Sequence, residues 1–178
     1  PPLTDTPNTA AYGAKKAKPD DIARAIVRGL ARDTPEVTIG IVKATAPVLV
    51  QHGVAITTAM YERLFVDAEI KALFDQAAQE SGEQPRRLAA AIVAFAQNVD
   101  NLPALSGAIE KMATRHVQTH VRPEHYPSVA AALLPAIRDV LGEAATDEVL
   151  GAWGEAYGFL ADVLIAREAQ MYALEPVN

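Results

Sequence analysis

Apolar residues recur every three or four positions along most of this 178-residue chain, from about residue 35 to Tyr172. This spacing places them on one face of an α-helix, and no stretch shows the strict alternation typical of a β-strand. The chain is therefore expected to be all-α. The pattern predicts helices at about 35–53 and 54–66, a short turn at 68–74, a polar loop at 75–83, and later helices covering 88–99, 105–116, 127–141 and 146–172.

Residues that favour helix ends support these boundaries. Pro35 suits a first helical turn, and Gly53 and Gly142 are each expected to follow the end of a helix. Thr146 has the side chain of a good N-cap and precedes two acidic residues, so it is expected to open the last helix.

The first 34 residues differ in character from the rest. They carry six Lys or Arg and four Asp, a charge of +2, which leaves −8 for the remaining residues of a chain whose net charge is −6. Residues 1–19 contain four prolines and predict a flexible arm, and a short amphipathic helix is expected to follow them. We therefore expect an N-terminal extension at 1–34, one helical domain at 35–174 and a tail at 175–178.

Composition excludes several classes of function. The chain has no cysteine, which excludes disulfides, Cys–metal sites, Fe–S clusters and thiol catalysis. Its negative charge argues against a nucleic-acid partner, because nucleic acids bind to basic surfaces. No uninterrupted apolar run approaches the ~20 residues of a transmembrane helix. No signal peptide is recognisable, so a cytoplasmic location is expected.

Two polar residues interrupt the apolar faces of predicted helices. His116 closes an apolar stripe, and a neutral imidazole can bind a metal through one nitrogen and donate a hydrogen bond through the other. Glu168 lies on the apolar face of the last helix, where a carboxylate needs a donor. On pattern alone His116 could also be a core histidine bonded to a carbonyl, and Glu168 could bend to solvent.

Three further polar residues come from other parts of the chain. Tyr126 lies between Pro123 and Pro127, Tyr61 is on the inner face of its helix, and Gln84 precedes an apolar stripe by one turn. Each also has an ordinary interpretation, as a packing tyrosine or a surface glutamine. Together with His116 and Glu168 they supply a ligand, two residues that can tune it, and two hydrogen-bonding groups, which are the parts of a haem site.

Three segments resemble the bacterial haemoglobins of the flavohaemoglobin and single-domain type: VKATAP at 42–47, NVDNLPA at 98–104 and AWGEAYG at 152–158. The resemblance covers about three quarters of the chain, and residues 80–85 resemble the single-domain members especially. It implies a globin fold that holds haem b. Two departures from the family are expected: no part of these 178 residues resembles the flavin and nicotinamide reductase domain of the larger relatives, and the family core has no counterpart of the N-terminal arm.

The resemblance implies roles on the proximal side of the haem. His116 matches the iron ligand, the metal-binding residue. Tyr126 and Glu168 match the partners that bond to this histidine and give it anionic character, which pushes electron density onto the iron.

It also implies roles on the distal side. Tyr61 and Gln84 match the pair that steadies bound dioxygen. Leu88 matches the apolar residue over the iron, and Phe74 matches the phenylalanine packed on the haem edge.

The expected function is reversible binding of dioxygen, with nitric oxide and carbon monoxide as further ligands. Oxidation of nitric oxide to nitrate would need electrons from a separate flavin reductase. Three alternatives stay open: a peroxidase-like or nitrite-reducing haem protein; a sensor or interaction module whose N-terminal helix docks on a partner or forms a homodimer; and a zinc site at His116, His120 and His125.

Overall fold

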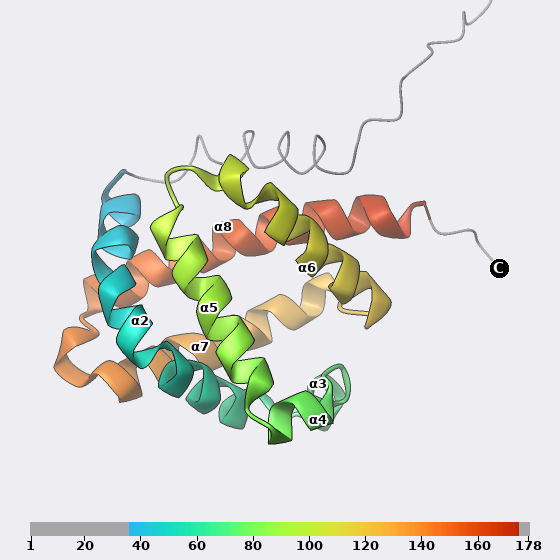
Figure 1. Ribbon diagram of the computed structural model, residues 1–178, viewed down its shortest axis with the longest axis horizontal. Coiled ribbons are helices and arrows are strands. Elements are labelled where there is room, and N and C mark those ends of the chain that lie inside the picture. Colours follow the sequence, from blue (N-terminus) through green and yellow to red (C-terminus); the bar gives the residue numbers. More distant parts are fainter. Residues whose placement is uncertain (1–35, 175–178) are drawn as a thin grey trace, which may run out of the picture.

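The computed structural model describes residues 36–174, which form helices and 3-10 turns without a β-strand among them (Figure 1). The helices are α2 (Glu36–Leu64), α3 (Ala68–Ala72), α4 (Gln76–Glu80), α5 (Glu83–Gln97), α6 (Ser106–Gln118), α7 (Tyr126–Leu141) and α8 (Asp147–Tyr172). The 3-10 turns are η1 (Leu102–Leu105), η2 (Pro123–His125) and η3 (Gly142–Ala144). The all-α prediction is confirmed, whereas the expected extension at 1–34 and the tail at 175–178 lie outside the described residues.

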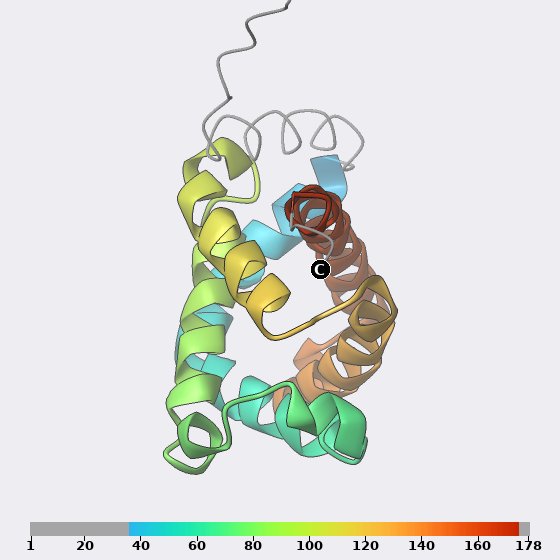
Figure 2. The same cartoon turned by 90° about the vertical axis from the view of Figure 1, so that its right-hand side faces the viewer.

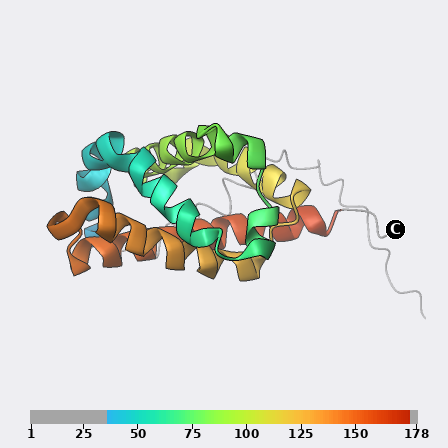
Figure 3. The ribbon, with the colours of Figure 1, turned by 90° about the horizontal axis from the view of Figure 1, so that it is seen from below.

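The helices form two layers that α2 connects. Helices α5 and α6 lie on one side of the molecule and α7 and α8 on the other, as two perpendicular views show (Figures 2 and 3). Helix α2 packs against α5, α7 and α8, and α6 packs against α8. The end of α6 and the second half of α8 therefore come together, although these segments are about fifty residues apart in the sequence.

The prediction of two helices between residues 35 and 66 is wrong. The chain forms one continuous helix, α2, that runs through Gly53. A side chain at Gly53 would start 3.3 Å from the Cβ atom of Ala89 in α5. The glycine allows a close approach of two helices, so it marks a crossing point and not a helix end.

The expected polar loop at 75–83 contains a short helix, α4. Asp75 is its N-cap, and its side chain accepts a hydrogen bond from the backbone N–H of Ala78 at 3.2 Å. Ala78 is buried and gives this short helix an attachment to the rest of the protein. The polar composition concealed the helix, because an Asp cap and a single buried alanine leave no apolar stripe.

Two other boundary predictions are confirmed. Thr146 is the N-cap of α8, and its hydroxyl accepts a hydrogen bond from Val149 N–H at 3.2 Å. Gly142 follows α7 with φ = 56°, a left-handed backbone that glycine adopts without strain.

Helices α2 and α8 are long and apolar enough, by length and composition, to cross a membrane. Core helices of globular proteins meet the same criterion, and both helices contribute fully buried side chains to the core. Examples are Val42, Ile56 and Met60 from α2 and Val163 and Glu168 from α8.

We predict that Gly53→Val destabilises the fold by roughly 1–3 kcal/mol, because the added methyl groups overpack the crossing of α2 and α5. Gly40→Val is the matched control in the same helix, since nothing lies within 4 Å of a Cβ atom at Gly40. This control should change stability by less than about 0.5 kcal/mol. Urea unfolding followed by circular dichroism measures both variants, and equal stabilities would show that the crossing is not tight at Gly53.

Candidate functional site

His116 lies in the last turn of α6 and is only partly buried. Its side chain is 26% exposed, whereas Ala113 and Val117, which belong to the buried face of the same helix, are 0% and 8% exposed as whole residues. The imidazole is therefore not fully enclosed by the packed core.

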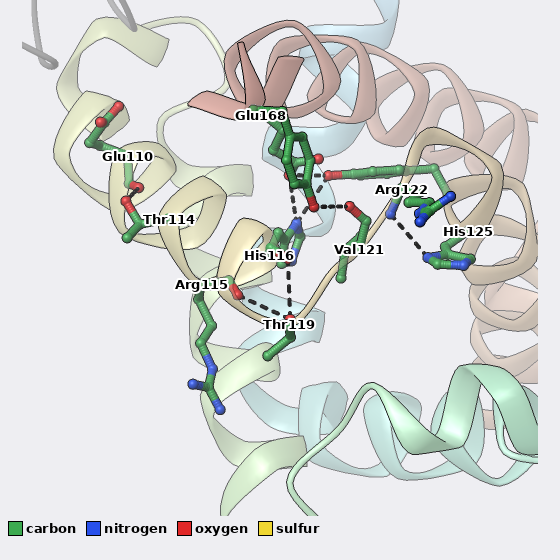
Figure 4. Close-up of polar contacts among 11 residues, drawn as sticks. Glu110, Thr114, Arg115, His116, Thr119, Val121, Arg122, His125 and Glu168 are labelled. Atoms are coloured by element: carbon green, nitrogen blue, oxygen red, sulfur yellow. Dashed lines mark hydrogen bonds and ion pairs between the residues drawn. The ribbon is translucent and has the colours of Figure 1, made fainter. Parts of the chain in front are cut away.

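The Nδ1 atom of His116 is held by two residues from other helices (Figure 4). It lies 2.7 Å from Glu168 Oε1, in α8, and 3.0 Å from the hydroxyl of Tyr126, the first residue of α7. Tyr126 in turn donates to the same Glu168 oxygen at 2.6 Å. Three predicted residues are thus brought together, and with a carboxylate as acceptor the proton sits on Nδ1, which leaves the Nε2 lone pair free to bind a metal.

The carboxylate of Glu168 is nearly inaccessible to water. The residue is 2% exposed, and its Oε2 atom is buried without a hydrogen-bond partner among the described residues. Burial, followed by the hydrogen bond to Glu168 and the negative charge of that group, raises the pKa of Tyr126 far above its usual value of about 10. Tyr126 therefore stays protonated and remains a donor to the carboxylate.

The backbone around Tyr126 is fixed by further contacts. The hydroxyl of Tyr157, in α8, donates to the Tyr126 carbonyl at 2.8 Å. The connection from α6 is held by Val121, whose backbone N–H donates to the His116 carbonyl at 2.9 Å. These bonds hold the histidine and its two partners in one arrangement.

A second group of predicted residues lies between α2 and α5. Gln84 donates through Nε2 to the hydroxyl of Tyr61 at 3.4 Å, a long contact. Phe65 and Phe74 pack on the ring of Tyr61, with ring centroids 5.3 and 5.5 Å away. Tyr61 is 5% exposed, and burial raises its pKa, so its hydroxyl remains a neutral donor.

The predicted apolar residues near the site are only partly buried. Leu88 of α5 and Phe74 pack against the core without being enclosed by it. Ile92 of α5, Met112 of α6 and Val121 behave in the same way. Large apolar side chains that are only partly covered can contact a flat apolar group such as haem. No hydrogen bond within residues 36–174 joins the Tyr61 group to the His116 group.

Sequence reasoning missed two features near the site. Gln79 of α4 lies beside Tyr61, where its amide moderates the raised pKa of that hydroxyl, and its Nε2 atom is buried without another partner among the described residues. Arg167 forms a buried ion pair with Glu110. The first was concealed in a segment expected to be a loop. The second joins residues that are 57 positions apart, so no local pattern indicates it.

The zinc alternative finds no support in the geometry. Within residues 36–174 no group of three or more His, Cys, Asp or Glu is arranged to hold a metal ion. Nδ1 of His116 faces Glu168, and Nδ1 of His125 accepts a hydrogen bond from the Arg122 backbone at 3.1 Å. The three histidines therefore do not converge.

Comparison with known proteins places this arrangement in a family. The sequence matches the family model described as Globin over residues 58–164. It is 55% identical over 132 residues to a flavohemoprotein of Xylella fastidiosa, which covers 74% of this chain and 33% of the relative. A flavohemoprotein of Rhizobium meliloti is 49% identical over 136 residues, or 76% of this chain and 34% of the relative. The chain thus spans about a third of the length of these relatives.

Similarity to solved structures supports the same family. A bacterial globin from Campylobacter jejuni superimposes with a TM-score of 0.73 at 38% identity, covering 78% of this chain and 99% of that one. An engineered carbene transferase, derived from a candidate nitric oxide dioxygenase of Rhodothermus marinus, gives a TM-score of 0.74 at 42% identity, covering 79% and 96%. The helical arrangement, the family match over most of the described residues and these relatives all support one conclusion. This chain therefore belongs to the globin family.

Proposed function

We propose that this chain binds haem b through the Nε2 atom of His116. The observation that carries the proposal is the contact of His116 Nδ1 with Glu168 at 2.7 Å, because it holds the imidazole with its other nitrogen free. Haem would supply the gas-binding and redox chemistry. Globin and flavohemoprotein relatives imply haem binding, and a flavohemoglobin structure from Malassezia yamatoensis contains bound FAD and heme.

We further propose reversible binding of dioxygen as the primary activity, with nitric oxide and carbon monoxide as further ligands. Tyr61 and Gln84 are the distal pair: the tyrosine hydroxyl donates to the partly negative bound gas, and Gln84 orients that hydroxyl. Leu88 and Phe74 keep water from the site. A donor in an apolar surround stabilises developing negative charge more strongly than the same donor in water.

Oxidation of nitric oxide to nitrate extends this activity. One nitric oxide, one dioxygen and one electron give one nitrate, so each turnover needs an electron from outside the globin part. We propose a flavin reductase as the donor, acting as a separate protein. The flavohemoprotein names of the relatives and a candidate nitric oxide dioxygenase among the structural neighbours support this.

A second function, peroxidase-like or nitrite-reducing chemistry, is favoured by the contacts around Glu168. A buried carboxylate that accepts from His116 Nδ1 gives the imidazole anionic character, and this promotes cleavage of bonds in oxidising ligands. Peroxide turnover well above that of an oxygen-storage globin would support it.

We expect Tyr61→Phe to speed dioxygen release about threefold to thirtyfold, which corresponds to a loss of about 0.7–2 kcal/mol of hydrogen bonding. Nitrate formed per nitric oxide should fall in the variant at low dioxygen. Stopped-flow replacement of dioxygen by carbon monoxide gives the rate. Thr58→Val removes a hydroxyl from an exposed position of the same helix, where it donates to the Val54 carbonyl, and should change the rate less than twofold. An unchanged rate in Tyr61→Phe would remove this residue from the ligand pocket.

Glu168→Gln should weaken the iron–histidine bond, because a carboxamide lacks the charge that makes the imidazole anionic. Resonance Raman of the ferrous, ligand-free variant should show a lower iron–histidine stretching frequency. A separate kinetic assay should show slower peroxide turnover. Asp162→Asn makes the same chemical change at an exposed position of α8 and should leave both unaltered. A wild-type frequency in Glu168→Gln would count against the proposed role of the carboxylate.

A further inference from the structure

The ion pair between buried Arg167 and partly buried Glu110 is bidentate. Arg167 of α8 donates from Nε and Nη2 to the two carboxylate oxygens of Glu110 in α6, each at 2.7 Å. The Arg167 side chain is 5% exposed and that of Glu110 is 16% exposed. Two parallel bonds between planar groups fix their relative orientation as well as their distance.

Stability alone does not explain this pair. The other Lys or Arg ion pairs among residues 36–174 are at least 38% exposed, as expected for contacts of small net value. A buried pair loses hydration on both sides, and apolar replacements of similar size often leave stability unchanged or higher. The best-attested use of such a pair is to specify one arrangement of the elements it joins.

The arrangement it specifies contains the histidine site. Glu110 and His116 are six residues apart on α6, about 9 Å along the helix axis. Their partners, Arg167 and Glu168, are consecutive on α8, so the two contacts point in directions roughly 100° apart around that helix. One bond alone would allow α6 to pivot on α8. Two such contacts prevent both sliding and rotation.

We propose that the Arg167–Glu110 pair is a positioning device for the proximal site. It fixes the distance and angle between the Glu168 carboxylate and His116 Nδ1, and through them the strength of the bond between the histidine and the haem iron. The inference rests on the proposed role of His116 as iron ligand. Arg167 and Glu110 touch neither the haem nor its ligands in this assignment.

Loss of one partner also changes the charge between the two helices. When Glu110 is replaced by Gln, the buried arginine loses its carboxylate partner, and the second contact between α6 and α8 is weakened. The contact between Glu168 Oε1 and His116 Nδ1 is then less well fixed, and the imidazole becomes less anionic.

The test uses Glu110→Gln and Arg167→Lys in the full haem-loaded chain. Arg167→Lys keeps the positive charge but cannot make two parallel bonds. We expect both variants to lower the iron–histidine stretching frequency, to values between wild type and Glu168→Gln, and to shift the ferric/ferrous midpoint potential upward. The exchange Glu110→Arg with Arg167→Glu should return the frequency toward wild type, because it rebuilds the pair in reverse.

A merely structural role predicts a different result. Asp139→Asn breaks the exposed ion pair with Arg63, between α7 and α2, and should leave the frequency and the potential unchanged. If Glu110→Gln and Arg167→Lys lower the melting temperature but retain the wild-type frequency and potential, the positioning role is overturned. Should Glu110→Gln fail to fold, Arg167→Lys and Glu110→Asp decide by the same readouts.

The experiment also distinguishes failure of the proposed haem ligation by His116 from failure of the positioning inference. If the wild-type protein shows no iron–histidine stretch, or if His116→Ala retains it, then His116 is not the ligand. In that case the proposed function fails before the ion pair is tested. If the iron–histidine stretch is lost in His116→Ala but keeps its wild-type frequency in the Glu110 and Arg167 variants, only the positioning inference is refuted.

Discussion

The buried carboxylate of Glu168 is the constraint on which the proximal half of this structure depends. A carboxylate that is 2% exposed is costly to hold away from water unless donors surround it, and its two donors among the described residues come from other helices. His116 arrives from α6 and Tyr126 from α7, so three helices must meet at one oxygen atom. The Arg167–Glu110 pair and the Tyr157–Tyr126 bond secure the same meeting point from two sides.

The two halves of the site differ in how tightly they are built. Around His116 the hydrogen bonds are 2.6–3.0 Å long and link three helices. Around Tyr61 the bond from Gln84 is 3.4 Å long, and the rings of Phe65 and Phe74 pack on the tyrosine ring. A rigid proximal side and a looser distal side suit a protein that must keep its cofactor while admitting and releasing a small ligand.

Short-range sequence patterns predicted the features of the structure that depend on neighbouring residues in the sequence. The apolar periodicity predicted the all-α class and the polar interruptions at His116 and Glu168, and the side-chain type of Thr146 predicted the cap of the last helix. It misjudged Gly53, because a glycine that ends a helix and one that admits a neighbouring helix are identical in sequence. It missed α4, which has no apolar stripe, and the Arg167–Glu110 pair, which joins residues 57 positions apart. The functional assignments of Leu88 and Phe74 came from family resemblance alone and remain proposals.

The most direct test of the account is chemical rescue of the axial ligand. His116→Gly should fold and take up haem, but its absorption spectrum should lose the bands of histidine-ligated ferrous haem, and added imidazole should restore them by filling the space of the missing side chain. Free imidazole cannot reproduce the covalent link to α6, so the restored spectrum should vanish on dialysis. A spectrum of His116→Gly identical to that of wild type, without imidazole, would contradict the account.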